Sequence, residues 1–161
     1  MYKMTILGSG AAPGVPAIAI GWGRCDPNNP KNCRTRTTVY LEYNNTKILI
    51  DTSPDLRSQL LSKHIDHLNA VLYTHPHADH LHGIDDLREI NRVNGSSLNF
   101  YGTESTLKVI KTRFPYLLAT PEHTNDVSTH PSLIANEVEY YKPFFINDLK
   151  ITPIRLIGHV I

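Results

Sequence analysis

The order of hydrophobic and polar residues predicts several short strands. Residues 70–73 are an apolar run typical of a buried strand, residues 3–7 also predict a short buried strand, and residues 98–101 predict a further strand. Residues 37–42 and 47–50 are rich in β-branched side chains, and Asn44-Asn45 between them is a turn signal. These two runs therefore predict a β-hairpin.

Helical spacing of apolar residues follows in three segments. Leu56, Leu60 and Leu61 come after Ser53-Pro54, which predicts a helix capped by Ser53 with Pro54 at its first position. Residues 83–91 predict a short helix, and residues 103–114 predict an amphipathic one.

The pattern weakens after residue 117. We expect residues 118–136 to form an exposed excursion without regular structure, because they contain prolines and many polar residues. Strand character returns in residues 138–141, 144–146 and 149–156, with Asn147-Asp148 as a turn. Strands interleaved with helices predict an α/β (α+β) domain in which helices cover a mixed sheet.

Composition narrows the class of protein. A chain of 161 residues is long enough for a single domain over residues 1–161. The net charge of +1 produces no strong electrostatic field that would attract nucleic acid. Nucleic acid stays a possible partner, but the net charge does not support it. We expect no membrane span and no signal peptide. Two cysteines, Cys25 and Cys33, make no disulfide framework, so a cytoplasmic location is the simplest inference.

The most informative stretch directly follows the apolar run at residues 70–73. It contains His75, His77, Asp79 and His80, four potential metal ligands within six residues. In extended backbone, His75 and His77 point the same way, and the next two ligands can address a second position. That spacing suits a pair of divalent metal ions, an arrangement used to split phosphoesters and other esters.

These residues resemble the signature of the metallo-β-lactamase superfamily, His-x-His-x-Asp-His. Asp51 after the run at 47–50, and the glycine turn Gly8-Ser9-Gly10, match other parts of the pattern. Further matches are similar to a bacterial branch with phosphoribosyl cyclic phosphodiesterases and relatives of transfer-RNA 3′-processing nucleases: Gly14-Val15-Pro16, Cys25-Asp26-Pro27, Asn32, Arg34, Arg36-Thr37, residues 51–57 and residues 84–88.

The resemblance implies an αββα sandwich, of which this chain holds the N-terminal part, and a site for two zinc or manganese ions. His75, His77 and His159 would bind the first ion, and Asp79 and His80 the second. Asp79 would also hold the attacking hydroxide, which makes it the expected catalytic residue. Asp51 would position the metal loop by hydrogen bonds. The expected substrate is a small phosphodiester or nucleotide-like molecule.

The same resemblance implies a later aspartate and a later histidine, which do not occur by Ile161. We therefore expect a chain truncated at its C-terminus, which pairs as a homodimer or with a complementing C-terminal fragment. Two alternatives stay open: a hydrolase of other esters, lactones or thioesters, and an inactive fragment or half of a split enzyme. Cys25 and Cys33 are read as free thiols rather than as ligands of a structural zinc.

Overall fold

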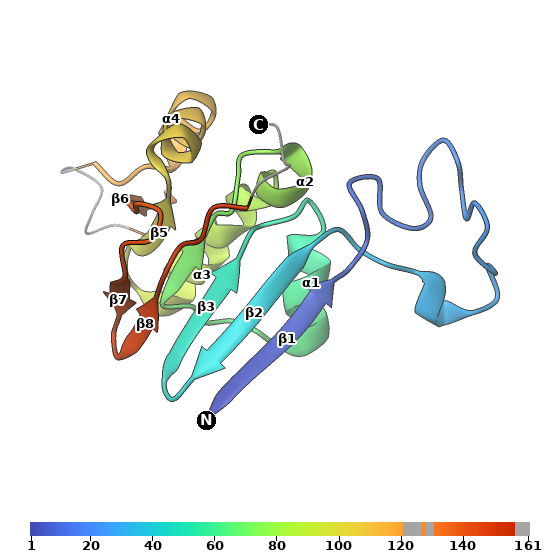
Figure 1. Cartoon of the computed structure of the whole chain (residues 1–161), viewed down its shortest axis with the longest axis horizontal. Helices are drawn as coiled ribbons and strands as arrows, with labels where there is room; N and C mark the ends of the chain where they lie inside the picture. Colours follow the sequence, from blue (N-terminus) through green and yellow to red (C-terminus); the bar gives the residue numbers. More distant parts are fainter. Residues whose placement is uncertain (121–126, 128–130, 157–161) are drawn as a thin grey trace.

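A six-stranded mixed sheet organises the computed structural model (Figure 1), which describes residues 1–120, 127 and 131–156. The strands lie in chain order, β1 to β6. β1 (Tyr2–Gly8), β2 (Thr38–Tyr43) and β3 (Thr46–Ile50) are antiparallel neighbours. β4 (Ala70–Leu72), β5 (Leu98–Gly102) and β6 (Leu133–Glu137) then add in parallel to β3 and to one another. The predicted hairpin at 37–50 is confirmed, with Asn44 at φ 50° in its turn.

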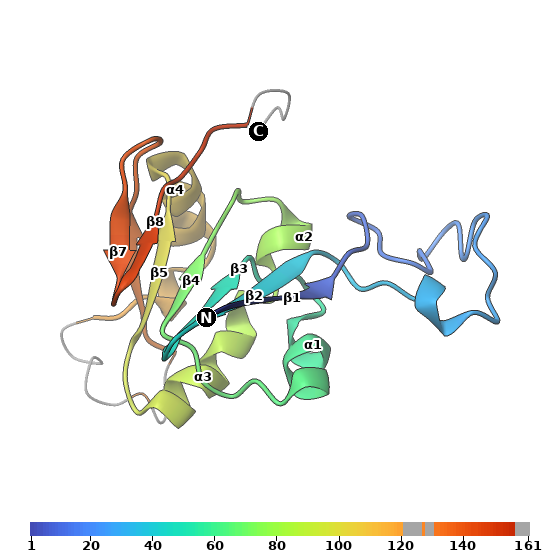
Figure 2. The ribbon, with the colours of Figure 1, turned by 60° about the horizontal axis from the view of Figure 1, so that its bottom comes forward.

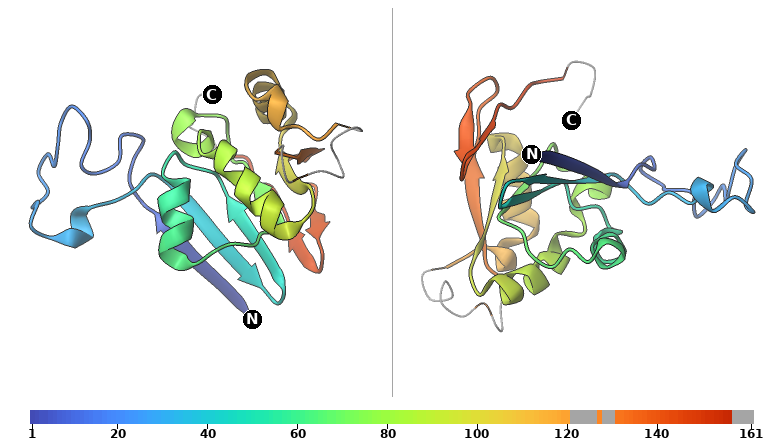
Figure 3. Two further views of the ribbon diagram at one scale, coloured as in Figure 1. Left: turned by 180° about the vertical axis from the view of Figure 1, so that it is seen from behind. Right: turned by 90° about the horizontal axis from the view of Figure 1, so that it is seen from below.

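Helices cover one face of this sheet. α1 (Leu56–Lys63), α3 (Leu87–Asn94) and α4 (Glu104–Arg113) bury leucine and isoleucine side chains against Leu49, Val71 and Phe100 of the central strands. Seen from behind, α1 and α3 lie across the strands (Figure 3). The main core therefore sits between the sheet and these helices.

The opposite face carries a second, smaller layer. β7 (Phe144–Ile146) and β8 (Leu149–Ile151) form an antiparallel hairpin, and Asn147 at φ 51° makes its turn. Ile146 and Leu149 of this hairpin pack against Ile48 and Ala70 of the sheet. Figure 2 shows the hairpin standing on the side of the sheet away from α1 and α3.

A long segment between β1 and β2, residues 9–37, projects away from this body (Figures 1 and 2). Apart from the single 3-10 turn η1 (Pro30–Asn32), this segment has no helix. Hydrogen bonds hold the two ends of this segment together beside the sheet. The Thr35 hydroxyl donates to the Leu7 carbonyl of β1, and the Thr37 hydroxyl donates to the Gly10 carbonyl, at 3.2 Å each. Within the described residues, no helix has the length and hydrophobicity that a membrane crossing requires.

The expected α/β arrangement of a sheet covered by helices is confirmed, but four local predictions about strands and helices were wrong. β6 covers the last residues of the predicted excursion at 118–136 and pairs in parallel with β5. Residues 138–141 form a turn rather than a strand, with Tyr141 at φ 65° and a bond from Lys142 N to the Glu139 carbonyl (3.2 Å). The last predicted strand ends at Ile151 instead of residue 156.

The fourth correction concerns helix starts. Ser53 is not the cap of α1, since the capping position is Asp55 and no side chain caps the helix. Ser53 instead accepts a bond from the Asp55 amide at 3.3 Å and donates one to Gln59 at 3.2 Å. The predicted helix at 83–91 is split into the 3-10 turn η2 (Ile84–Asp86) and α3, which continues to Asn94 and stops at Gly95, φ 65°.

Candidate metal centre

The predicted ligands lie at the carboxyl ends of two neighbouring parallel strands. Asp51 follows β3 directly, and residues 74–80 follow β4. Because β3 and β4 run in parallel, both segments leave the sheet at the same edge. The Asp51 amide continues the pairing by bonding the Leu72 carbonyl at 2.8 Å.

Three imidazole rings gather at this edge. The ring of His75 lies 4.6 Å from that of His77 and 4.2 Å from that of His80, measured between centroids. Asp79 joins them, since its carboxylate lies 3.4 Å from Nε2 of His80. Asp79 and His80 stand on α2 (Ala78–Leu81), a four-residue helix that the sequence pattern did not predict. The structure therefore brings together four of the five predicted ligands, whereas His159 lies outside the described residues.

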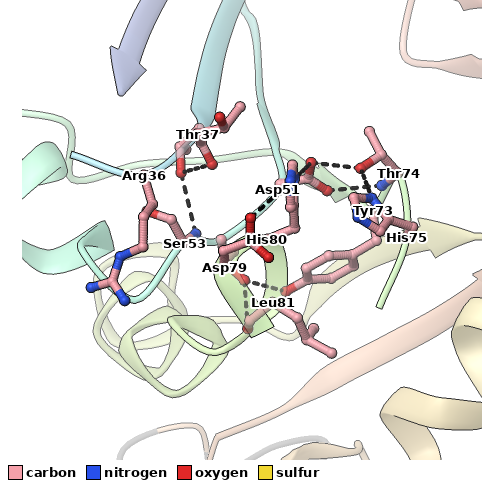
Figure 4. Close-up of polar contacts among 12 residues, drawn as sticks. Arg36, Thr37, Asp51, Ser53, Tyr73, Thr74, His75, Asp79, His80 and Leu81 are labelled. Carbon is pink, nitrogen blue, oxygen red and sulfur yellow. Dashed lines mark hydrogen bonds and ion pairs between the residues drawn. The ribbon is translucent and has the colours of Figure 1, made fainter. Parts of the chain in front are cut away.

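Asp51 is the buried hub of the cluster, with 2% of its surface exposed. Figure 4 shows its carboxylate between Thr74 and His80. It accepts bonds from the Thr74 amide (2.8 Å), the Thr74 hydroxyl (2.7 Å) and Nδ1 of His80 (2.7 Å). The bond to Asp51 raises the pKa of His80 against the opposing effect of partial burial. Asp51 holds this position at φ 63°, a strained conformation for a side chain other than glycine.

The helix α2 is fixed to the end of β3 by Thr52. The Thr52 amide bonds the His80 carbonyl at 2.7 Å, and the Gly83 amide bonds the Thr52 carbonyl at 2.9 Å. The Thr52 hydroxyl donates to the Leu81 carbonyl at 3.0 Å, so it must accept from the Tyr73 hydroxyl, also 3.0 Å away. Burial raises the pKa of Tyr73, which keeps this phenol protonated as a donor.

Sequence reasoning missed Thr52 and Tyr73 as parts of the site. The signal was a hydroxyl-bearing residue within two positions of each strand end, but it does not reveal that hydroxyls 21 residues apart meet. Gly83 is required here for a different reason: a Cβ at this position would lie 2.0 Å from the Ser53 carbonyl oxygen. The turn after α2 is therefore packed directly on the loop that follows β3.

An ion pair joins the projecting segment to the same region. Arg36 donates to both carboxylate oxygens of Asp55 at 2.7 and 2.8 Å, and its amide adds a third bond at 2.8 Å. These bonds to Arg36 hold the pKa of Asp55 below its usual value. Gln59 extends the link by donating to the Arg36 carbonyl at 2.8 Å. The start of α1 is thus tied to the end of the 9–37 segment.

The donor set fits a divalent metal ion in its chemistry. Imidazole nitrogen and carboxylate oxygen are ligands of zinc and manganese, and a second carboxylate that orients a ligating histidine is typical of such sites. Nevertheless, among the described residues no three His, Cys, Asp or Glu side chains are already arranged around one ion position. The cluster is therefore a set of candidate ligands in which Asp51 orients the ring of His80 directly.

Comparison with known proteins decides the family. A family model described as a beta-lactamase superfamily domain matches residues 46–160, which include the whole cluster. The chain belongs to the metallo-β-lactamase superfamily. This confirms the resemblance seen in the sequence.

Individual relatives place the chain more closely within the superfamily. It is similar to the crystal structure of a diphosphatase from the PhnP family, with a TM-score of 0.78 and 31% identity, covering 93% of this chain and 55% of that one. Its fold is also like the short form of human tRNase Z (TM-score 0.56, 22% identity, 85% of this chain and 45% of that one). The 31% identity with the PhnP-family diphosphatase agrees with the expected branch, and both likenesses confirm the fold class.

A curated relative gives a further view of the chain's extent. An octanoyltransferase from Porphyromonas gingivalis (strain ATCC BAA-308 / W83) is 37% identical over 155 residues, which are 96% of this chain and 30% of that protein. This metallo-β-lactamase chain therefore spans less than a third of that relative and about half of the PhnP-family diphosphatase.

Proposed function

We propose that this chain is the metal-binding part of a metallo-hydrolase that acts on phosphodiesters. The observation that carries the proposal is that three imidazoles and two carboxylates meet at the ends of β3 and β4. One of these carboxylates, that of Asp51, accepts a hydrogen bond from the ring of His80. Support for phosphoester chemistry comes from the 31% identity with a PhnP-family diphosphatase.

Each side chain has a proposed role. His75 and His77 hold one divalent ion, and Asp79 and His80 hold another, with zinc and manganese as the candidates. When bound, such ions lower the pKa of water and stabilise charge on a phosphoryl group. Asp79 accepts a hydrogen bond from the attacking water and orients it toward phosphorus. Asp51 holds the imidazole of His80 through the 2.7 Å bond to Nδ1.

The remaining ligands come from outside the described residues. His159 is one candidate, and a partner polypeptide is the other, either a second copy of this chain or a fragment that completes the domain. This part of the proposal is supported by the partial set of candidate ligands among the described residues.

The proposed substrate is a small phosphodiester or a nucleotide. A net charge of +1 provides little electrostatic attraction for a long nucleic acid. The likeness to tRNase Z, at 22% identity, concerns the fold alone. Acyl transfer is not carried over from the octanoyltransferase, because the match covers 30% of that protein.

Hydrolysis of a bis-aryl phosphodiester and of a cyclic nucleotide phosphodiester, each with added manganese or zinc, tests the proposal. The wild-type chain is compared with His77→Ala, and with His67→Ala as a matched histidine variant outside the cluster. We expect turnover by the wild type and by His67→Ala, and a loss of at least about 100-fold in His77→Ala.

A chain that binds metal but turns over neither diester, at concentrations that include a dimer, would contradict the proposed activity. Equal rates in the wild type and His77→Ala would contradict the proposed site. Both assays are run on protein shown to be folded and free of aggregates, so that loss of structure is not mistaken for loss of the site.

A further inference from the structure

Thr74 lies between the buried carboxylate of Asp51 and the ring of His75. Its hydroxyl oxygen is 2.7 Å from Oδ2 of Asp51 and 2.9 Å from Nδ1 of His75. Its amide is also bound, donating to Oδ1 of Asp51 at 2.8 Å. The backbone and the side chain of Thr74 are thus both fixed by the same carboxylate, which Figure 4 shows beside it.

The position of the protons follows from what each group can donate. A threonine hydroxyl has one hydrogen, and an ionised carboxylate only accepts. The Thr74 hydrogen therefore goes to Asp51, and the same oxygen can only accept from His75. A neutral His75 must then carry its proton on Nδ1, which leaves Nε2 with the lone pair that a metal ion needs.

The same carboxylate oxygen sets His80 without an intermediary. Nδ1 of His80 lies 2.7 Å from Oδ2 of Asp51, so it carries the proton that forms this bond. Its Nε2 faces Asp79 at 3.4 Å. One oxygen of Asp51 thus orients two histidines, one directly and one through the hydroxyl of Thr74.

We propose that Thr74 is a positioning residue that fixes the tautomer and ring orientation of His75, so that Nε2 is the nitrogen presented to metal. This inference rests on the proposed function, because it assigns His75 as a ligand. It makes a specific demand on the side chain: any hydroxyl suffices, whereas a methyl group of the same shape does not. Thr74→Val and Thr74→Ser are therefore opposite tests of one contact.

The direct test is the tautomer of His75 in the metal-free chain, read from the ring ¹⁵N chemical shifts by NMR above the titration range of histidine. The His75 signals are assigned by their loss in His75→Gln. We expect the Nδ1–H form in the wild type and in Thr74→Ser. In Thr74→Val we expect the Nε2–H form to become populated, because the acceptor of the Nδ1 proton is gone. Thr112→Val removes an exposed helical hydroxyl and serves as the matched control.

Zinc affinity gives a second readout that does not depend on turnover. Loss of a group that orients a ligating histidine lowers metal affinity by about 10- to 100-fold, which we expect for Thr74→Val. Thr74→Ser and Thr112→Val should bind zinc as the wild type does. A Thr74→Val chain that keeps the wild-type tautomer of His75 would overturn the inference.

The two proposals fail in distinguishable ways. If the wild type binds no metal but Thr74→Val still changes the tautomer, the proposed function fails and the role of Thr74 in fixing the ring stands. If the wild type binds zinc and Thr74→Val binds it equally well, the site stands and the role of Thr74 is refuted.

Discussion

The two faces of the central sheet are covered very differently. On one face α1, α3 and α4 leave Leu49, Val71 and Phe100 with no exposed surface. On the other face the β7–β8 hairpin packs on Ile48 and Ala70 of the middle strands, and the view from below in Figure 3 shows β1 lying away from the hairpin. Beyond it, Tyr2, Met4 and Ile6 of β1 are 66%, 67% and 62% exposed.

The helix-covered face supports the candidate site, whereas the open face exposes apolar side chains that are available for contact with another polypeptide. Leu81 and Ile84, which follow the candidate ligands of residues 75–80, are buried in the core under the helices. The site is therefore supported by the well-packed face. A row of exposed apolar side chains on a sheet is typical of an interaction surface, and it agrees with the proposal that a partner polypeptide completes the site.

The largest expected effect comes from truncating a side chain under the helices. Phe100→Ala should lower the free energy of unfolding by about 3–5 kcal/mol, because Phe100 has no exposed surface and its ring packs against Tyr73 at 6.0 Å. Met4→Ala on the open face should change it by no more than about 0.5 kcal/mol. Urea denaturation of both variants measures the contrast, and similar costs would show that the two faces are packed alike.

The β7–β8 hairpin should rank next. Ile146 is 5% exposed and packs on Ile48 and Ala70, so Ile146→Ala should cost about 2–3 kcal/mol in unfolding free energy. Phe145→Ala, at the neighbouring exposed position, is the matched control and should be close to neutral. If both variants unfold at the wild-type midpoint, the hairpin contributes nothing as a second layer.

Removal of one buried hydroxyl at the site should have a smaller effect. Tyr73→Phe keeps the ring but deletes the donor to Thr52, and we expect a loss of about 0.5–1.5 kcal/mol in unfolding free energy. Because Thr52 holds the Leu81 carbonyl, zinc affinity should fall as well. Calorimetric titration with zinc measures the change in affinity. Unchanged affinity would show that the Tyr73 hydroxyl does not influence metal binding by residues 75–80.

The smallest effect concerns the joint between the 9–37 segment and α1. Arg36 lowers the pKa of Asp55, so the pair adds stability above the unfolded pKa of about 3.9, and this is lost as the pH falls through the lower folded value. Both side chains are partly exposed, at 29% and 24%, which limits the expected contribution to about 1 kcal/mol. Unfolding measured from pH 6 to pH 2 should show an acid-side decline that is shallower in Asp55→Asn. Parallel profiles would contradict the prediction.

Local signals were sufficient where sequence neighbours make the structure. The β2–β3 hairpin and α4 lie within short segments, and both were predicted. β6 was missed because its strand state depends on a distant partner. Leu133 pairs with Leu98, and the buried Asn91 bonds the amide and carbonyl of Ser132 at 3.1 and 2.9 Å.

The candidate site shows the same limit. The spacing of His75, His77, Asp79 and His80 led to their prediction as ligands, and Asp51 was predicted from the family resemblance. The roles of Thr52, Tyr73 and Thr74 depend on the approach of β3 and β4, which no local pattern encodes. At residues 138–141 the opposite error occurred, because a strand was predicted where none forms. Their aromatic and β-branched side chains favour a strand, but the chain turns there through Tyr141.

Whether the cluster at residues 75–80 binds metal is tested most directly by the metal content of the purified, folded chain. The wild type and the His75→Ala/His77→Ala double variant are equilibrated with zinc or manganese, and their metal content is measured by elemental analysis. We expect at least about one ion per chain in the wild type, lost in the variant, with a second ion bound where a partner completes the site. Equal metal content in the two proteins, or none in either, would contradict the assignment of this cluster as a metal centre.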